Sequence, residues 1–239
     1  MTHEERMRRF SQGDLYVVIT EEFCGGRAAK EVLNHVLRAG VRIVQFREKH
    51  GTDRDLFRRA CVFRDLTARV GALLIVDDRL DIALASGADG VHLGQDDLPV
   101  ARAREIAPDL VIGASTHNLD EALHAQQDGA SYVNIGPIFP TQTKTVSTGA
   151  VGLTMITAVT PHLRIPWTVM GGIKEDNVDA VLERGASIVA VVTAVTAATD
   201  VYEATSALRA RILSKRGKSI AGLSFCESNL SEPFISRPE

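Results

Sequence analysis

The sequence lacks the features that mark several broad classes of protein. No stretch approaches the roughly 18 consecutive apolar residues that a membrane-spanning helix needs. The first residues, Met1 to Gly13, are polar and charged and contain no apolar core of a secretory signal, so we expect a cytoplasmic protein. A formal net charge of -3 provides no general basic field, so neither nucleic acid nor a membrane is an expected partner.

Cysteine is also scarce. Cys24, Cys61 and Cys226 are odd in number and fit no metal-ligand spacing, so reduced thiols without an assigned function are the simplest interpretation. With 45% apolar and 24% charged residues, the composition is ordinary for a globular enzyme. The 239 residues suffice for one large core.

Short apolar runs of β-type alternate with longer helical patterns along the chain. The expected strands are Leu15–Thr20, Arg42–Arg47, Ala72–Asp77, Gly90–Leu93, Leu110–Ala114, Tyr132–Gly136, Trp167–Met170 and Ser187–Thr193. The expected helices include Arg27–Ala39, Asp53–Val70, Asn118–Asp128 and Lys174–Arg184. This alternation predicts βαβ units and a parallel sheet buried on both faces.

The repeats fill the chain from Leu15 to about Leu213 and predict an α/β fold, a closed (β/α)8 TIM barrel in a single domain. We expect a polar N-terminal extension at residues 1–13, the catalytic barrel at 14–213 and a flexible C-terminal tail at 214–239. A doubly wound open sheet is the alternative, but no Gly-x-Gly-x-x-Gly follows the first strand.

Glycine next to alanine precedes several of the expected strands. Such a glycine can end a helix in the left-handed conformation and allow a tight turn into the next strand. The positions are Gly40, Gly71, Gly87, Gly129 and Gly185. They report architecture and not chemistry.

Active sites of such barrels lie at the C-terminal ends of the strands, and unusual polar residues gather there in this sequence. After the second strand, Gln45, Arg47 and Lys49 share one face of an extended chain. An amide can recognise a heterocycle, and two cations can hold a pyrophosphate. The alternative is a solvated strand end with a surface ion pair through Glu48.

Pairs of carboxylates follow the third and fourth strands. Asp77-Asp78 and Asp96-Asp97 offer the hard oxygen ligands that suit Mg2+, and one carboxylate from each loop would make a convincing site. The alternative is that these residues cap the helices that follow. His92 lies within the fourth strand, where a packed or supporting histidine is favoured over a metal ligand.

Hydroxyl groups and a histidine follow the fifth strand. Ser115 can hydrogen-bond a ligand, and either Thr116 or Asn118 can cap the next helix. His117 could act as an acid or base, but we identify no carboxylate partner for it in the sequence. A structural role is therefore preferred for His117.

The loop after the sixth strand is the most distinctive segment. It contains Pro137 and Pro140 and then presents Thr141, Thr143 and Lys144, which suit an oxyanion. The segment from Thr141 to Gly152 could also cover the mouth of the barrel as a lid.

Glycines and a hydroxyl follow the last two strands, where barrels often bind phosphate through backbone N–H groups. Gly171 and Gly172 let the backbone approach an anion closely, and Val192-Thr193 ends the eighth strand. The alternative for the two glycines is packing alone.

Taken in order, these motifs resemble the thiamine-phosphate synthase family from Leu15 to about Val195. The matching motifs are Gln45–Lys49, Asp77–Arg79, His92–Asp97, Ser115–His117, Gly136–Lys144, Gly171–Ile173 and Val192–Val195. The resemblance implies a transferase that joins hydroxymethylpyrimidine pyrophosphate to hydroxyethylthiazole phosphate with Mg2+. In that reaction pyrophosphate leaves first, and the thiazole nitrogen captures the pyrimidinyl cation.

The resemblance also implies a role for each matching residue. The pyrimidine pyrophosphate would be held by Gln45, Phe46, Arg47, Glu48, Lys49, Asp77, Ser115 and Lys144. The thiazole phosphate would be held by Thr141, Gln142, Thr143, Gly171, Gly172, Val192 and Thr193. Asp78 and Asp97 would bind Mg2+, and Arg47, Lys49 and Lys144 would act in catalysis by neutralising the leaving pyrophosphate.

Three positions depart from the family pattern. Asp77 stands where the family commonly has Asn, Thr193 replaces the usual Ser, and Met170 replaces a smaller or aliphatic residue.

Two rival functions are a thiazole tautomerase that uses His117 without a metal and a non-catalytic sensor of thiamine intermediates. The expected partners are two small phosphorylated substrates, and a homo-oligomer is possible although the sequence does not show one.

Overall fold

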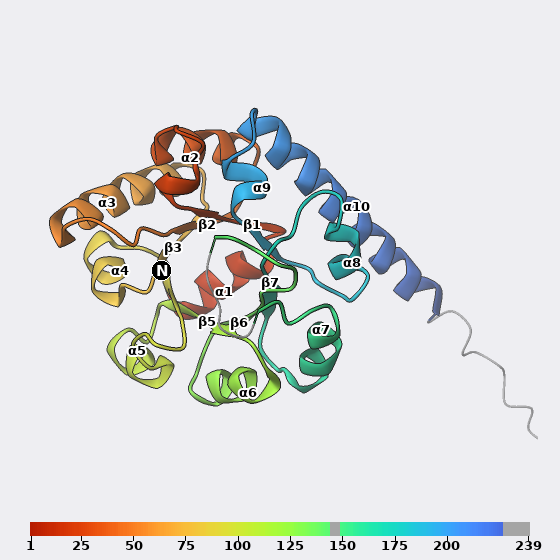
Figure 1. Ribbon diagram of the computed structural model, residues 1–239. Helices are drawn as coiled ribbons and strands as arrows, with labels where there is room; N and C mark the ends of the chain where they lie inside the picture. Colours follow the sequence, from red (N-terminus) through yellow and green to blue (C-terminus); the bar gives the residue numbers. More distant parts are fainter. Residues whose placement is uncertain (144–148, 227–239) are drawn as a thin grey trace, which may run out of the picture.

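The apolar runs of the sequence form strands that close into a parallel barrel surrounded by helices (Figure 1). The structure, a computed structural model, describes residues 1–143 and 149–226, with residues 217–226 described by their backbone alone. The strands are β1 Leu15–Ile19, β2 Ile43–Phe46, β3 Leu73–Asp77, β4 Gly90–Leu93, β5 Val111–Thr116, β6 Tyr132–Ile135, β7 Trp167–Val169 and β8 Val189–Val191.

Closure of the sheet is visible in the pairing of its first strand. Tyr16 of β1 pairs with Ile43 of β2 on one side and with Ala190 of β8 on the other. The strand order runs without interruption from β1 to β8. The predicted (β/α)8 barrel is therefore confirmed, and the open doubly wound sheet is excluded.

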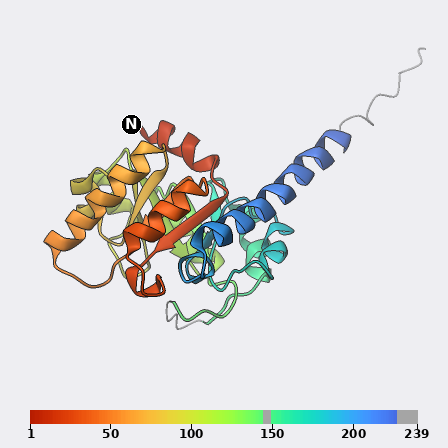
Figure 2. The same cartoon turned by 90° about the horizontal axis from the view of Figure 1, so that it is seen from above.

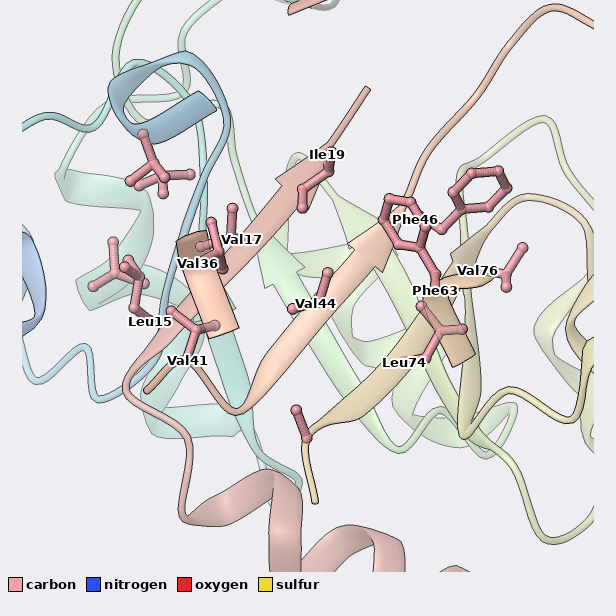
Figure 3. Packing of buried hydrophobic residues seen from close by; sticks show 14 of the residues in the cluster. Leu15, Val17, Ile19, Val36, Val41, Val44, Phe46, Phe63, Leu74 and Val76 are labelled. Atoms are coloured by element: carbon pink, nitrogen blue, oxygen red, sulfur yellow. The ribbon is translucent and has the colours of Figure 1, made fainter. Parts of the chain in front are cut away.

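Side chains along each strand alternate between the barrel interior and the layer beneath the helices, as the strand period of two requires. Val17, Val44 and Leu74 belong to the large apolar cluster between strands and helices, which Figure 3 shows from close by. Their neighbours Tyr16 and Ile43 belong to a separate cluster inside the barrel. This alternation decides which polar residues can reach the site.

Helices cover the outside of the barrel (Figure 1). They are α2 Ala29–Arg38, α3 Asp53–Arg69, α4 Leu80–Ser86, α5 Val100–Ile106, α6 Leu119–Gln127, α7 Thr154–Val159, α8 Val178–Leu182, α9 Thr193–Thr196 and α10 Val201–Cys226, with short 3-10 turns at Glu21–Phe23 and Thr160–His162. The glycines expected before strands at positions 40, 71, 87, 129 and 185 all have positive φ, which confirms their predicted left-handed conformation.

The N-terminal extension forms a helix, α1 His3–Ser11, which lies at one end of the barrel (Figure 2). Thr2 and Glu5 form a capping box at its start. Phe10 is fully buried, and its ring stacks on Tyr132 with centroids 4.5 Å apart. The extension predicted only as polar therefore contributes an apolar contact to the barrel interior.

The last helix, α10, crosses the boundary expected at Leu213 and continues to Cys226. Before that boundary, Arg209 forms a paired contact with Asp14 at 2.9 and 2.7 Å, which ties α10 to the start of β1. Beyond it, Arg216 donates to the carbonyl of Gly13 at 2.8 Å. The flexibility of the predicted tail stays a prediction, and residues 227–239 lie outside the described residues. None of the helices described has the length and apolar character needed to cross a bilayer.

Candidate active site

The C-terminal end of β2 supplies the cations of the site. Gln45, Arg47 and Lys49 line one hollow of about 450 Å3, so the prediction that they point together is confirmed. Phe46 points the other way, where its ring meets Phe63 at 5.0 Å. The carboxylate of Glu48 also faces away from the hollow and pairs with Arg59 at 2.6 Å. This contact is the ion pair that the alternative interpretation proposed for Glu48.

Asp77 stands between the two cations at the end of β3. Its carboxylate lies 3.3 Å from the Arg47 Nε and 2.9 Å from the Lys49 Nζ. Burial, with the negative charge of Asp78 beside it, raises the pKa of Asp77 to about 6. The extra acidic group noted in the sequence is thus directly paired with the expected phosphate-binding cations.

The carboxyl groups of Asp78 and Asp97 come together from adjacent loops. Burial, together with the neighbouring Asp78 carboxyl, raises the pKa of Asp97. Burial also opposes ionisation of Asp78, but the hydrogen bond and charge of Lys49 lower the pKa of Asp78 below its usual value. Two carboxyl groups so placed would offer oxygen ligands to a divalent cation, and the predicted role of Asp78 and Asp97 as metal ligands stays a prediction.

The helix-capping alternative is not what the structure shows for these carboxylates. The N-cap position of α4 is Arg79 and that of α5 is Pro99, and neither helix has a side-chain cap. Asp97 instead accepts a hydrogen bond from the backbone N–H of Gly94 at 2.6 Å, which fixes its loop. Asp78 has φ of 58°, an unusual conformation for a residue other than glycine, and such strain often marks functional sites.

The fifth strand places Ser115 and His117 on the wall of a second hollow of about 400 Å3. His117 Nδ1 lies 2.8 Å from the Glu121 carboxylate, so the conclusion that this histidine has no carboxylate partner is wrong. The two residues are four apart, which is the spacing that brings side chains together on a helical turn. Asn118 caps α6 by accepting from the Glu121 N–H, while the Thr116 hydroxyl donates to the Asn134 carbonyl.

The loop after β6 lies over the same hollow. The hydroxyls of Thr141 and Thr143 lie 3.0 Å apart and both line the cavity, whereas Gln142 is exposed. Lys144 and the middle of the expected lid, residues 144–148, lie outside the described residues, so the predicted roles of Lys144 and of the lid stay predictions.

The glycines after β7 contact that loop directly. A Cβ at Gly171 would lie 2.4 Å from Pro137, and one at Gly172 would lie 2.5 Å from the Pro140 carbonyl oxygen. Both glycines also have positive φ. Close packing therefore does require glycine at both positions, as the alternative interpretation proposed. The two glycines also line a third hollow of about 330 Å3 together with Val192 and Thr193.

The three hollows adjoin, because all of them are lined by Thr143 and Met170. Charged groups mark the end at β2 to β4, and glycines with Thr193 mark the end at β7 and β8. Met170, which departs from the family pattern, lies between the two ends. The adjoining hollows therefore have two chemically different ends.

Three buried polar residues lie in the barrel interior. The sequence interpretation gives no role to two of them, and only a packed or supporting position to the third, His92. Tyr16 and Tyr132 lie in β1 and β6 and hydrogen-bond to each other at 3.0 Å, and His92 Nδ1 lies 2.9 Å from the Tyr132 hydroxyl. Their positions on the inward-facing side of their strands are the signal that could have identified them. His92 has the supporting position that its sequence context favours.

A closed (β/α)8 barrel with cations, acidic residues and glycine loops at the C-terminal ends of its strands defines an enzyme that handles small phosphorylated molecules. The model of the family described as thiamine monophosphate synthase matches residues 15–195. A thiamine-phosphate synthase of Chloroflexus aurantiacus is 45% identical over 206 residues, which cover 86% of this chain and 95% of that protein. A thiamine-phosphate synthase of Dictyoglomus thermophilum is 41% identical over 224 residues, covering 92% of this chain and all of the relative.

Solved structures agree with these relatives. A thiamine phosphate pyrophosphorylase from Pyrococcus furiosus superposes with a TM-score of 0.80 at 38% identity, covering 87% of this chain and 98% of that one. A 3-hexulose-6-phosphate synthase, at 21% identity and a TM-score of 0.59, shares the fold. The chain belongs to the thiamine monophosphate synthase family, and the resemblance inferred from its motifs is confirmed.

Proposed function

We propose that the protein condenses hydroxymethylpyrimidine pyrophosphate with hydroxyethylthiazole phosphate to give thiamine phosphate and pyrophosphate. The observation that carries the proposal is the carboxyl pair of Asp78 and Asp97 beside Lys49 and Arg47, at the charged end of three adjoining hollows. Family membership supplies the pair of substrates. We propose a cytoplasmic location from the sequence.

A charge count supports the proposal that Mg2+ takes part. Arg47 and Lys49 contribute two positive charges, whereas Asp77, Asp78 and Asp97 contribute up to three negative charges. This group therefore offers no net positive charge to a pyrophosphate. Asp78 and Asp97 present the oxygen donors that Mg2+ prefers, and Mg2+ held there supplies positive charge to the leaving pyrophosphate.

The side chains can promote the reaction without transferring a proton. The bond between the pyrimidine methylene carbon and the pyrophosphate oxygen breaks, and its electron pair leaves with pyrophosphate. The thiazole nitrogen then donates its lone pair to form the new carbon–nitrogen bond. Arg47, Lys49 and Lys144 stabilise the charge that grows on the leaving group, and adjoining hollows hold the two reactants in orientation.

We assign the thiazole phosphate to the opposite end of the hollow. In the described part of the chain, no group accepts a hydrogen bond from the backbone N–H of Gly172 or Thr193. The hydroxyls of Thr141 and Thr143 face the same space. Backbone N–H groups and hydroxyls at loops after the last two barrel strands are the usual means of binding phosphate in this fold.

The contact between His117 and Glu121 favours a second candidate function, isomerisation of the thiazole. A histidine oriented by a carboxylate in a cavity wall is suited to acid–base chemistry. That function gives no purpose to the carboxyl pair of Asp78 and Asp97, so we place it second. A sensor of thiamine intermediates would bind both ligands without turnover.

The test measures pyrophosphate release and thiamine phosphate formation by the purified protein with both substrates, with each substrate alone, and with EDTA followed by Mg2+. Thiamine phosphate that forms only with both substrates, is lost with EDTA and returns with Mg2+ supports the synthase. Isomerisation of the thiazole that is indifferent to EDTA would favour the tautomerase. Binding of both substrates without product would favour the sensor.

A further inference from the structure

A continuous chain of hydrogen bonds crosses the barrel interior beneath the site. The Gln45 Nε2 donates to the Tyr16 hydroxyl at 2.7 Å, and Tyr16 lies 3.0 Å from the Tyr132 hydroxyl. Tyr132 lies 2.9 Å from His92 Nδ1, and His92 Nε2 lies 2.9 Å from the Ser115 Oγ. We call these five residues the relay. Its two ends, Gln45 and Ser115, line the charged hollow.

The fold makes room for the relay at one strand position. A Cβ at Gly113 of β5 would lie 2.2 Å from the ring of Tyr132, so the tyrosine can cross the interior only because this residue is glycine. Phe10 of α1 stacks on the same ring. The ring of Tyr132 is therefore held by Phe10 and by the backbone at Gly113, and packing sets the position of its hydroxyl.

Counting protons along the relay links the polarity of its two ends. Each tyrosine hydroxyl carries a single proton, and burial keeps both tyrosines neutral by raising the pKa of Tyr16 and of Tyr132. Because Gln45 donates to Tyr16, the Tyr16 proton goes to Tyr132, and the Tyr132 proton goes to His92 Nδ1. His92 then carries its proton on Nε2 and donates to Ser115.

The ends of the relay consequently present opposite groups to a ligand. Gln45 has its amide N–H engaged by Tyr16 and offers its carbonyl oxygen as an acceptor. Ser115 accepts from His92 and keeps its own hydroxyl proton to donate. Reversing the Gln45 amide would require every later proton in the relay to reverse as well, so the two ends are coupled although they come from β2 and β5.

We propose that Tyr16, Tyr132 and His92 are positioning residues that fix this polarity and select an aminopyrimidine over an oxopyrimidine. An aminopyrimidine edge presents an N–H donor beside a ring-nitrogen acceptor, which matches Gln45 and Ser115. The oxo counterpart presents a carbonyl beside a ring N–H, which is the reversed pattern. The inference rests on the proposed function in placing a pyrimidine ring over these two residues.

Selection of this kind is strong because the mismatch leaves buried polar groups unpaired. An oxopyrimidine must either set its carbonyl against the Gln45 oxygen or reverse the whole relay. We expect the wild-type protein to prefer the amino ring by about 10- to 100-fold, the usual effect of a mispaired buried hydrogen bond.

The test is calorimetric titration of two uncharged probes, the free aminopyrimidine alcohol and the matching oxopyrimidine alcohol, into wild-type protein, Tyr16→Phe and Tyr132→Phe. Each substitution deletes a hydroxyl and keeps the ring. We expect the preference to fall about tenfold or more in each variant. The double variant should lose little more than either single variant, because a broken relay cannot be broken again.

Controls separate positioning from general structural damage. Tyr202→Phe removes a hydroxyl from α10, where the ring packs under Arg38, and should keep the wild-type preference. The KM for thiazole phosphate should stay unchanged in both relay variants while that for the pyrimidine pyrophosphate rises. Where a tyrosine variant does not fold, Ser115→Ala at the half-buried end should weaken binding of the amino probe more than that of the oxo probe.

The outcomes distinguish this inference from the proposed function. Equal binding of both probes by wild-type protein, binding of neither probe, or an unchanged preference in the relay variants would overturn the inference. A preference that depends on Tyr16 and Tyr132 in a protein that forms no thiamine phosphate would uphold the relay and refute the synthase.

Discussion

Phe10 offers a test of whether α1 is part of the barrel or a loose extension. The side chain is fully buried and stacks on Tyr132 with a centroid distance of 4.5 Å. Replacing a buried Phe by Ala typically costs about 3–5 kcal/mol, because contacts are lost and a cavity remains. Phe10→Ala should therefore lower the free energy of unfolding by about 3 kcal/mol or more, a large share of the roughly 5–15 kcal/mol that stabilises a typical domain.

The lower end of that range is favoured because α1 can undock as a unit. Outside Phe10, Met7 packs against the interior cluster, and polar contacts also hold the helix, with Arg6 donating to the Asp109 carbonyl at 3.0 Å and His3 Nδ1 lying 3.3 Å from the Leu110 carbonyl. Once docking becomes unfavourable, the barrel can expose its end instead of keeping a cavity. The loss is therefore limited to the free energy with which α1 docks.

Urea unfolding of Phe10→Ala, followed by fluorescence of the single tryptophan, Trp167 in β7, measures this loss. The control is Arg8→Ala, which removes an exposed side chain from the same helix and should change stability by no more than about 0.5 kcal/mol. A loss below about 1 kcal/mol for Phe10→Ala would show that the helix contributes little and that the stacked geometry is not a stabilising contact.

Three further outcomes are expected. Asp97→Asn keeps an acceptor for Gly94 but removes a charged ligand, so Mg2+-dependent turnover should fall at least about 100-fold while Asp96→Asn, at an exposed position, keeps full activity; equal rates would remove Asp97 from the metal site. Among the described residues, deleting Ser214–Glu239 removes the ion pairs of Lys215 with Asp179 and Glu183 and the hydrogen bond of Arg216 to the Gly13 carbonyl, so activity should persist and stability should drop by about 1 kcal/mol; loss of turnover would place the tail at the site. Burial, aided by the nearby acidic side chains, raises the pKa of Cys24 to about 11, so at pH 8 alkylation followed by peptide mapping should find Cys61 modified before Cys24, and Cys24 should become reactive only as the pH rises toward that value.

The features that follow from local periodicity could be predicted from the sequence. Alternation along β2 placed Gln45, Arg47 and Lys49 together, and the order of the strands placed Asp78 next to Asp97. Both inferences need only that neighbouring parallel strands end at the same edge of the barrel. The same alternation directs Phe46 and Glu48 away from the hollow. The motif alone does not distinguish these two residues from Gln45, Arg47 and Lys49, which line the hollow.

Contacts that depend on packing across the barrel could not be predicted in this way. The relay joins residues from five strands, and the spacing of Tyr16 and Tyr132 in the sequence gives no sign that their hydroxyls meet. The docking of α1 depends on two apolar residues in a polar segment, the buried Phe10 and the partly buried Met7. The partner of His117 could have been predicted from the sequence, because Glu121 stands four residues later at the start of a helix.

The extra carboxylate of this chain acts on the charge balance of the site. With Asn at position 77, the two cations Arg47 and Lys49 would face only the neighbouring carboxyl groups of Asp78 and Asp97. With Asp77 present, both cations already have a buried carboxylate partner within 3.3 Å. A pyrophosphate must therefore compete with Asp77 for Arg47 and Lys49, so in the proposed reaction more of the neutralising charge has to come from Mg2+ and Lys144.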